Sequence, residues 1–388
     1  MNHHLQNSDG RRILKASPKF IQRPELWGFI ASLAMFVLSG NLSTCHAQSR
    51  FATQSRTAAY HPTSAQLPTQ FPKLTRSGVS PGNLPDRLEQ TSLSACSRGL
   101  MSASDFLFYQ SLARDARLSH RKCSKREVQI IWQHYQSQIQ QIAKRLNMAS
   151  GSSGPSVFEQ ESCAIRFALA ESAVQIAQLT EDSSHIEAAR LREIGEAERW
   201  VSTVRQRMNL GLASPFELAS AEARLAKSRQ LPLAEQIAPW TKYLAWQSAS
   251  FNGRQSGAIN AISSAQLSVN ALQLENALDA ERLTEVERLC TAACQFSEDQ
   301  FAGTLNSVSQ PNLALPQLVR SLVLRDQMLR LQEHLPAEAS QSGRKRFDAD
   351  WSILNSIAAS TTDRRGRIGA DCIAVELCHA SFSASPQD

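Results

Sequence analysis

The residues that most often perform enzyme chemistry occur in this 388-residue chain without the spacings that catalysis requires. Its nine histidines include no His-Glu-x-x-His segment, which would place two metal ligands on one helix face. The glycine-rich phosphate loop and the Gly-x-Ser-x-Gly turn of serine hydrolases are absent as well. One acidic group has helical spacing and is predicted to form a solvated helix face: Glu181, Asp182, Glu187, Glu193, Glu196 and Glu198. We therefore expect no enzyme activity, no catalytic residues, no cofactor and no metal site.

The eight cysteines are scattered and include no Cys-x-x-Cys pair, which argues against a structural zinc site. Cys290 and Cys294 lie one helical turn apart, and they are either small buried side chains or a redox pair, the first being favoured. Near the other end, Cys372 and Cys378 either remain thiols or close a short loop as a disulfide, which export would permit.

The N-terminal residues 1–47 resemble a signal peptide, because a basic stretch precedes the apolar run Leu26–Leu38. Cleavage after Ala47 is one expectation. A second is a lipoprotein, in which Cys45 of the segment Leu-Ser-Thr-Cys would be lipidated, and a third is an uncleaved anchor. The true start could also lie downstream of Met1. We expect an exported protein of the cell outer membrane or periplasm.

The formal net charge of +6 gives no reason to expect a nucleic-acid partner. Residues 1–47 hold five Lys or Arg and two Asp or Glu, so this leader supplies half of the excess. The remainder lacks the concentrated basic face that nucleic-acid binding requires. With 42% hydrophobic and 20% charged residues, the composition also excludes collagen, a small disulfide knot and a polytopic membrane protein.

The elements around these residues are predicted to be helical. Residues 48–103 are rich in Ser, Thr, Pro and Gln and should form an extended or disordered linker. Residues 104–255 should form a first helical repeat with a hairpin tip near 209–217, whose arms are about 35 to 50 residues long. Its outgoing arm has a near-heptad apolar seam typical of a coiled coil: Leu191, Ile194, Ala197, Val201, Val204 and Met208.

The hairpin tip is predicted from stop and start signals that stand about three residues apart. Gly211 can take the left-handed conformation that ends a helix. Ser214 can cap the next helix, Pro215 suits its first position, and Glu217 completes a capping box. So short a connection implies an antiparallel reversal.

The sequence Arg-Met-Asn-Leu-Gly-Leu-Ala-Ser-Pro-Phe-Glu-Leu-Ala-Ser-Ala-Glu-Ala-Arg-Leu-Ala (207–226), followed by Leu-Pro-Leu-Ala-Glu (231–235), resembles the periplasmic hairpin of TolC-like outer-membrane efflux proteins. The resemblance covers about fifty residues. It implies a homotrimeric periplasmic duct for small solutes, four outer-membrane strands per protomer, and hairpin tips that meet a periplasmic adaptor and an inner-membrane pump. It makes Gly211, Leu212, Ala213 and Ser214 the expected partner contacts.

The rest of the chain should contain a strand or connector at 256–270, a second helical repeat at 271–360 and a C-terminal tail at 361–388. The roughly twenty residues between the repeats lack the aromatic girdle of a membrane strand pair, which favours a divergent or shortened relative of the TolC-like family. The predicted fold class is therefore mainly α, with long antiparallel coiled-coil hairpins and at most a small β portion. Three tryptophans on the first repeat are predicted to pack rather than bind a ligand: Trp200, Trp240 and Trp246.

Two functions remain open from the sequence. The first is an outer-membrane efflux component. The second is an exported periplasmic scaffold or interaction protein without transport activity. An efflux adaptor is disfavoured, because its Gly-rich β halves do not fit a chain with 16 glycines.

Overall fold

The computed structural model describes residues 84–119, 123–149, 157–250, 256–307, 311–333, 340–360 and 366–383. These residues form twelve helices and no strand, which confirms the predicted mainly α class. In chain order the helices are α2 (Leu84–Ser97), α3 (Ala103–Ser119), α4 (Lys125–Ala149), α5 (Val157–Thr180), α6 (Ser183–Asn209), α7 (Pro215–Ser228), α8 (Leu233–Ser250), α9 (Ser256–Asp279), α10 (Leu283–Ser307), α11 (Pro311–Glu333), α12 (Ser340–Ser360) and α13 (Gly366–Ser383).

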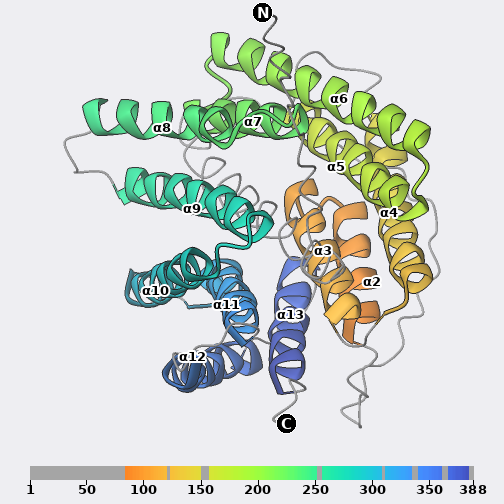
Figure 1. The fold of residues 1–388 in the computed structure, drawn as a ribbon. Coiled ribbons are helices and arrows are strands. Elements are labelled where there is room, and N and C mark those ends of the chain that lie inside the picture. The colour runs from red at the N-terminus through yellow and green to blue at the C-terminus, as the bar shows by residue number, and fades with distance from the viewer. Residues whose placement is uncertain are drawn as a thin grey trace, which may run out of the picture.

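The helices form an array in which each one packs against the next along the chain (Figure 1). The last helix, α13, also packs against α2 and α3, so the first and last described helices meet. The contacts α5 with α6, α6 with α7, and α10 with α11 are among the most extensive. Both predicted repeats thus belong to one closed array.

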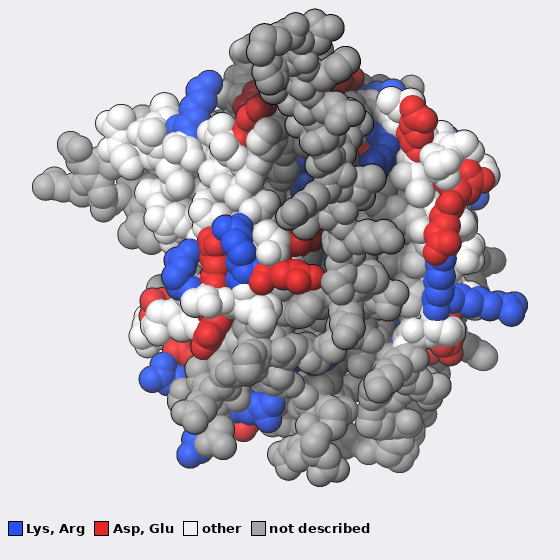
Figure 2. Space-filling model, in the orientation of Figure 1, with Lys and Arg blue, Asp and Glu red and all other residues white. Residues whose placement is uncertain are grey.

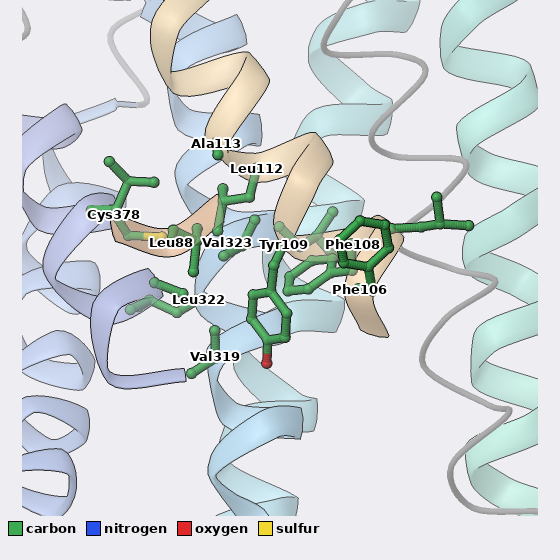
Figure 3. Close-up of a cluster of buried hydrophobic side chains, with 14 of the residues drawn as sticks. Leu88, Phe106, Phe108, Tyr109, Leu112, Ala113, Val319, Leu322, Val323 and Cys378 are labelled. Carbon is green, nitrogen blue, oxygen red and sulfur yellow. The ribbon is translucent and has the colours of Figure 1, made fainter. Parts of the chain in front are cut away.

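The core is centred on α3, whose residues 103–114 are all buried. Figure 3 shows Phe106 and Tyr109 of α3 among Leu88 of α2, Leu322 of α11 and Cys378 of α13. One continuous cluster of apolar side chains draws on every described helix except α8, whose Trp240 and Tyr243 pack in a second, smaller cluster with Phe216 of α7 and Ala265 of α9. Such burial stabilises the array by about 1.5–3 kcal/mol for each large apolar side chain.

The predicted return arm is shorter in the structure, because α7 ends at Ser228. Gln230 takes a positive φ of 55°, and the amide of Leu231 donates to the carbonyl of Ala226 over 3.0 Å. This is the Schellman geometry that ends a helix, formed here by glutamine in place of glycine. Glu281, with φ 53°, ends α9 in the same way and interrupts the outgoing arm of the second repeat.

Three predicted segment types were wrong. Residues 84–97 of the expected linker form α2, where Leu84, Leu88 and Ala95 are buried at helical spacing within a Ser-rich composition. The expected strand or connector at 256–270 lies inside α9. Residues 366–383 of the expected tail form α13, which packs through small side chains such as Ala370 and Ala374.

Residues 1–47, which were predicted to be a signal peptide, and Cys45 within them lie outside the described residues. None of the helices that the structure describes combines the length and apolar character needed to cross a lipid bilayer.

Candidate interaction site

The end of the α6–α7 hairpin is closed by backbone hydrogen bonds around Gly211. The amide of Leu212 donates to the carbonyl of Arg207 over 2.8 Å, and that of Gly211 to Met208 over 2.9 Å. Gly211 has a φ of +69°, a conformation that residues with a Cβ rarely adopt. These bonds form a Schellman motif and confirm the predicted role of the glycine.

The start of α7 is capped as the sequence predicts. The Ser214 hydroxyl accepts from the amide of Glu217 at 3.3 Å, while the Ser214 amide donates to Glu217 Oε2 at 2.7 Å. Pro215 occupies the first turn of α7. An N–H at that position would have no acceptor within the helix, so proline loses no helical hydrogen bond there. The reversal is therefore ordered by its own residues.

Arg207 connects this turn to α5. Its guanidinium donates to the carbonyl of Leu212 over 2.9 Å and also to the side chain of Gln160. Gln160 in turn donates to Glu217 Oε1 at 2.9 Å. Arg207 lies outside the heptad seam, where a charged side chain is expected to be solvated, but it is buried, because it contacts both the turn and Gln160 of α5. The signal available in the sequence was the carbonyl of Leu212, directly after Gly211, which Arg207 can reach as a hydrogen-bond donor.

Two leucines at the turn are exposed although they flank a rigid glycine. The exposed fraction is 59% for Leu210 and 54% for Leu212. Of the predicted contact residues, Gly211 and Leu212 are exposed, whereas Ala213 and Ser214 are half-buried and Ala213 packs against the core. Leu210, directly before Gly211, was not among the predicted contact residues but is exposed in the same way as Leu212.

A groove of about 440 Å³ runs along one face of the hairpin between α6 and α7. Val201 and Leu225 contribute apolar surface, and two ion pairs cross between the helices. Arg205 pairs with Glu222 and Arg229 pairs with Glu198, each at 2.7 Å. These exposed pairs each stabilise the hairpin by no more than about 1 kcal/mol.

Aromatic contacts hold the other face of the hairpin against α5. The guanidinium of Arg224 lies 4.6 Å from the ring centre of Trp200 and 5.0 Å from that of Phe167. Burial lowers the pKa of Arg224 to about 10, so the cation persists at neutral pH. The packing role predicted for Trp200 and Trp240 is confirmed. Trp246 is 43% exposed, and its ring centre lies 6.1 Å from that of Tyr243.

The acidic group on α6 is not uniformly solvated. Glu181, Asp182, Glu187 and Glu198 are exposed, and Glu196 is half-buried. Glu193 differs, because it accepts from the Ser228 hydroxyl at 3.0 Å and burial raises its pKa to about 7. The predicted solvated face was therefore wrong for Glu193.

The cysteines of the described residues are all thiols. Cys290 is fully buried, as favoured from the sequence, and burial raises the pKa of Cys294 to about 12, which makes a redox pair unreactive. The alternative of a Cys372–Cys378 disulfide is wrong, because both lie along α13 as thiols.

Neither the surface charge nor the arrangement of metal-ligating side chains indicates a second site on the described part of the chain. On the face in Figure 2, acidic and basic side chains lie interspersed. Among the described residues, no three His, Cys, Asp or Glu side chains lie close enough to hold a metal ion.

No protein-family model, curated protein or solved structure matches this chain.

Proposed function

We propose that this protein acts by binding rather than by catalysis, and that the end of its α6–α7 hairpin contacts a partner protein. The observation that carries the proposal is the exposure of Leu210 and Leu212 on a turn held by a Schellman motif, a capping box and Arg207. Ordered apolar side chains lose little conformational entropy on binding, and they gain free energy when a partner covers them.

The partner that fits this surface is a protein with an apolar contact face. Arg207 and Glu217 at the turn are engaged in its own hydrogen bonds, and the exposed Arg205 beside it pairs with Glu222. These charges therefore give little attraction to a strongly charged molecule. This corresponds to the scaffold or interaction function considered from the sequence, in the exported compartment that the N-terminal pattern indicates.

A second candidate is an efflux component, and one specific observation favours it. The segment that resembles the TolC-like hairpin, residues 207–226, does reverse direction at Gly211 and restart at Pro215. On this candidate the partners are two further copies, a periplasmic adaptor and an inner-membrane pump. Cell fractionation tests it: a heat-sensitive trimer extracted from the outer membrane supports transport, and a monomer in the soluble fraction contradicts it.

The binding proposal is tested by photo-crosslinking in the native cell. Leu212 is replaced by p-benzoyl-phenylalanine, and irradiation is expected to give one dominant adduct that the second substitution Leu210→Ser removes. Ile353 on α12, which is also exposed, is the matched control position and should give no such adduct. Equal adducts at both positions, or none at Leu212, would contradict the proposal.

A further inference from the structure

The closure of the helical array depends on one seam, defined here as the contact of α2 and α3 with α11 and α13. Most other helix contacts join neighbours along the chain. Across the seam, by contrast, the hydroxyl of Tyr109 on α3 donates to Asp371 Oδ1 on α13, 262 residues away. The seam is therefore the place where the array could open while its local helix pairs remain intact.

The seam is polar at its centre, although apolar side chains surround it. Asp105 of α3 pairs with Arg320 of α11 and, at 3.3 Å, with Arg367 of α13. Asp105, Tyr109, Arg320 and Asp371 are all buried. Three buried atoms here have no hydrogen-bond partner: Arg320 Nε, Arg367 Nε and Asp371 Oδ2.

This composition weakens the seam relative to an apolar contact of the same area. Buried charges lose hydration, and their mutual attraction restores only part of that loss. Opening would return the unpartnered atoms of Arg320 and Asp371 to water, whereas opening an apolar contact regains nothing comparable.

Charged groups reach Asp371 from three sides. Tyr109 and Asp105 face it from α3, Arg320 from α11, and Arg367 from its own helix. From α2, Arg87 pairs with Glu376 of α13 at 3.5 Å. Two neutral hydrogen bonds join α12 to α13: Trp351 Nε1 donates to the carbonyl of Val375, and the Cys372 thiol donates to that of Ala358.

Two charged side chains of α12 are paired elsewhere, Arg346 with Glu298 and Asp350 with Arg325. Asp371 is thus the carboxyl at the seam whose ionisation is opposed both by burial and by a neighbouring carboxylate, Asp105.

We propose that this seam is a pH-sensitive closure, which is shut when Asp371 is protonated and opens reversibly as Asp371 becomes charged. Opening would separate α13 and α11 from α2 and α3 and expose the apolar cluster between them. That cluster includes Leu88, Leu112 and Cys378 (Figure 3).

The sign of the pH dependence follows from the burial of Asp371. Burial raises the pKa of Asp371 to about 7, and Asp105 adds to this, while the Tyr109 hydrogen bond and the two arginines oppose it. In the open, hydrated state the pKa of Asp371 would be about 4. Between about pH 4 and 7 the closed form therefore holds a proton that the open form releases, so closure weakens as pH rises through this window.

Cys378 provides a native reporter of opening, because its thiol is buried on the seam side of α13. The experiment measures the rate at which N-ethylmaleimide alkylates Cys378 and Cys290 in the whole protein, by mass spectrometry of peptides. Cys290 is fully buried on α10 and outside the seam. The ratio of the two rates cancels the intrinsic pH dependence of thiol alkylation.

From pH 5 to pH 8 the Cys378 to Cys290 ratio is expected to rise by about ten- to a hundredfold. Asp371→Asn should remove the rise, because its side chain stays neutral at both pH values. Glu193→Gln removes a carboxyl outside the seam whose pKa is also raised to about 7, and it should leave the rise intact. A flat ratio in the wild-type protein overturns the proposal, and so does a rise that survives in Asp371→Asn or disappears in Glu193→Gln.

Discussion

Gly211 is the residue on which the hairpin turn depends most directly. An added Cβ would meet no atom within 4 Å, so a substitution there acts through the backbone alone. We expect Gly211→Ala to lower the free energy of unfolding by about 1 kcal/mol, because alanine resists positive φ. Urea denaturation followed by circular dichroism measures this.

The matched control is Gly195, in the middle of α6, where an added Cβ also has open space. Gly195→Ala should raise the free energy of unfolding by about 0.5–1 kcal/mol, because alanine favours helix more than glycine does. Two changes of the same sign and size would contradict the assigned turn geometry.

Ser214 contributes through its hydroxyl, which accepts the free amide of Glu217 at the start of α7. Ser214→Ala is expected to destabilise the protein by about 0.5–2 kcal/mol through the lost cap, read from the shift in thermal midpoint. The exposed Ser248 bonds only to a carbonyl of its own helix, so Ser248→Ala should have almost no effect. A similar loss from both variants would show that the cap is not formed.

At the scale of elements, the α6–α7 hairpin shows what local patterns predict well. The sequence located the turn from Gly211, Ser214, Pro215 and Glu217, because each residue acts on backbone groups within a few positions. The early end of α7 escaped prediction, because Gln230 provides the left-handed residue that glycine usually supplies. Burial of Arg207 and Glu193 was also missed, because it depends on α5 and α7, which are distant in sequence.

Arg207 should contribute more to the free energy of unfolding than the exposed arginines of α6. Arg207→Met keeps most of the apolar stem but leaves the Leu212 carbonyl and the Gln160 side-chain oxygen without their donor. We expect a loss of about 1–3 kcal/mol in the free energy of unfolding, measured in urea.

Arg205 is the matched control, two residues earlier on α6, where it forms the exposed pair with Glu222. Arg205→Met should cost less than about 1 kcal/mol. If Arg205→Met were as destabilising as Arg207→Met, the connection between the turn and α5 would contribute nothing.

At the scale of the whole molecule, the first and last described helices contact each other, and no local sequence pattern predicts this contact. α2 and α13 lie in segments whose composition predicted a linker and a tail, yet both complete the core around α3. Both helices bury large aliphatic side chains against other helices, Leu84 and Leu88 in α2 and Ile373 and Leu377 in α13. The two segments therefore acquire helical stability from tertiary burial as well as from intrinsic propensity. The function proposed for the hairpin tip depends on this array, which holds α6 and α7 against α5.

Asp105 is the charge that links three helices across the seam, and its removal should lower the free energy of unfolding of the whole array. Asp105→Ala leaves the buried Arg320 without its carboxylate and removes the partner of Arg367. Removing one member of a buried ion pair typically destabilises a protein by about 3–5 kcal/mol, which we expect here in urea denaturation. Glu376→Ala breaks the more exposed 3.5 Å pair with Arg87 at the same seam and should cost less than about 1 kcal/mol. Equal losses from the two variants would mean that the seam is not held by its buried charges.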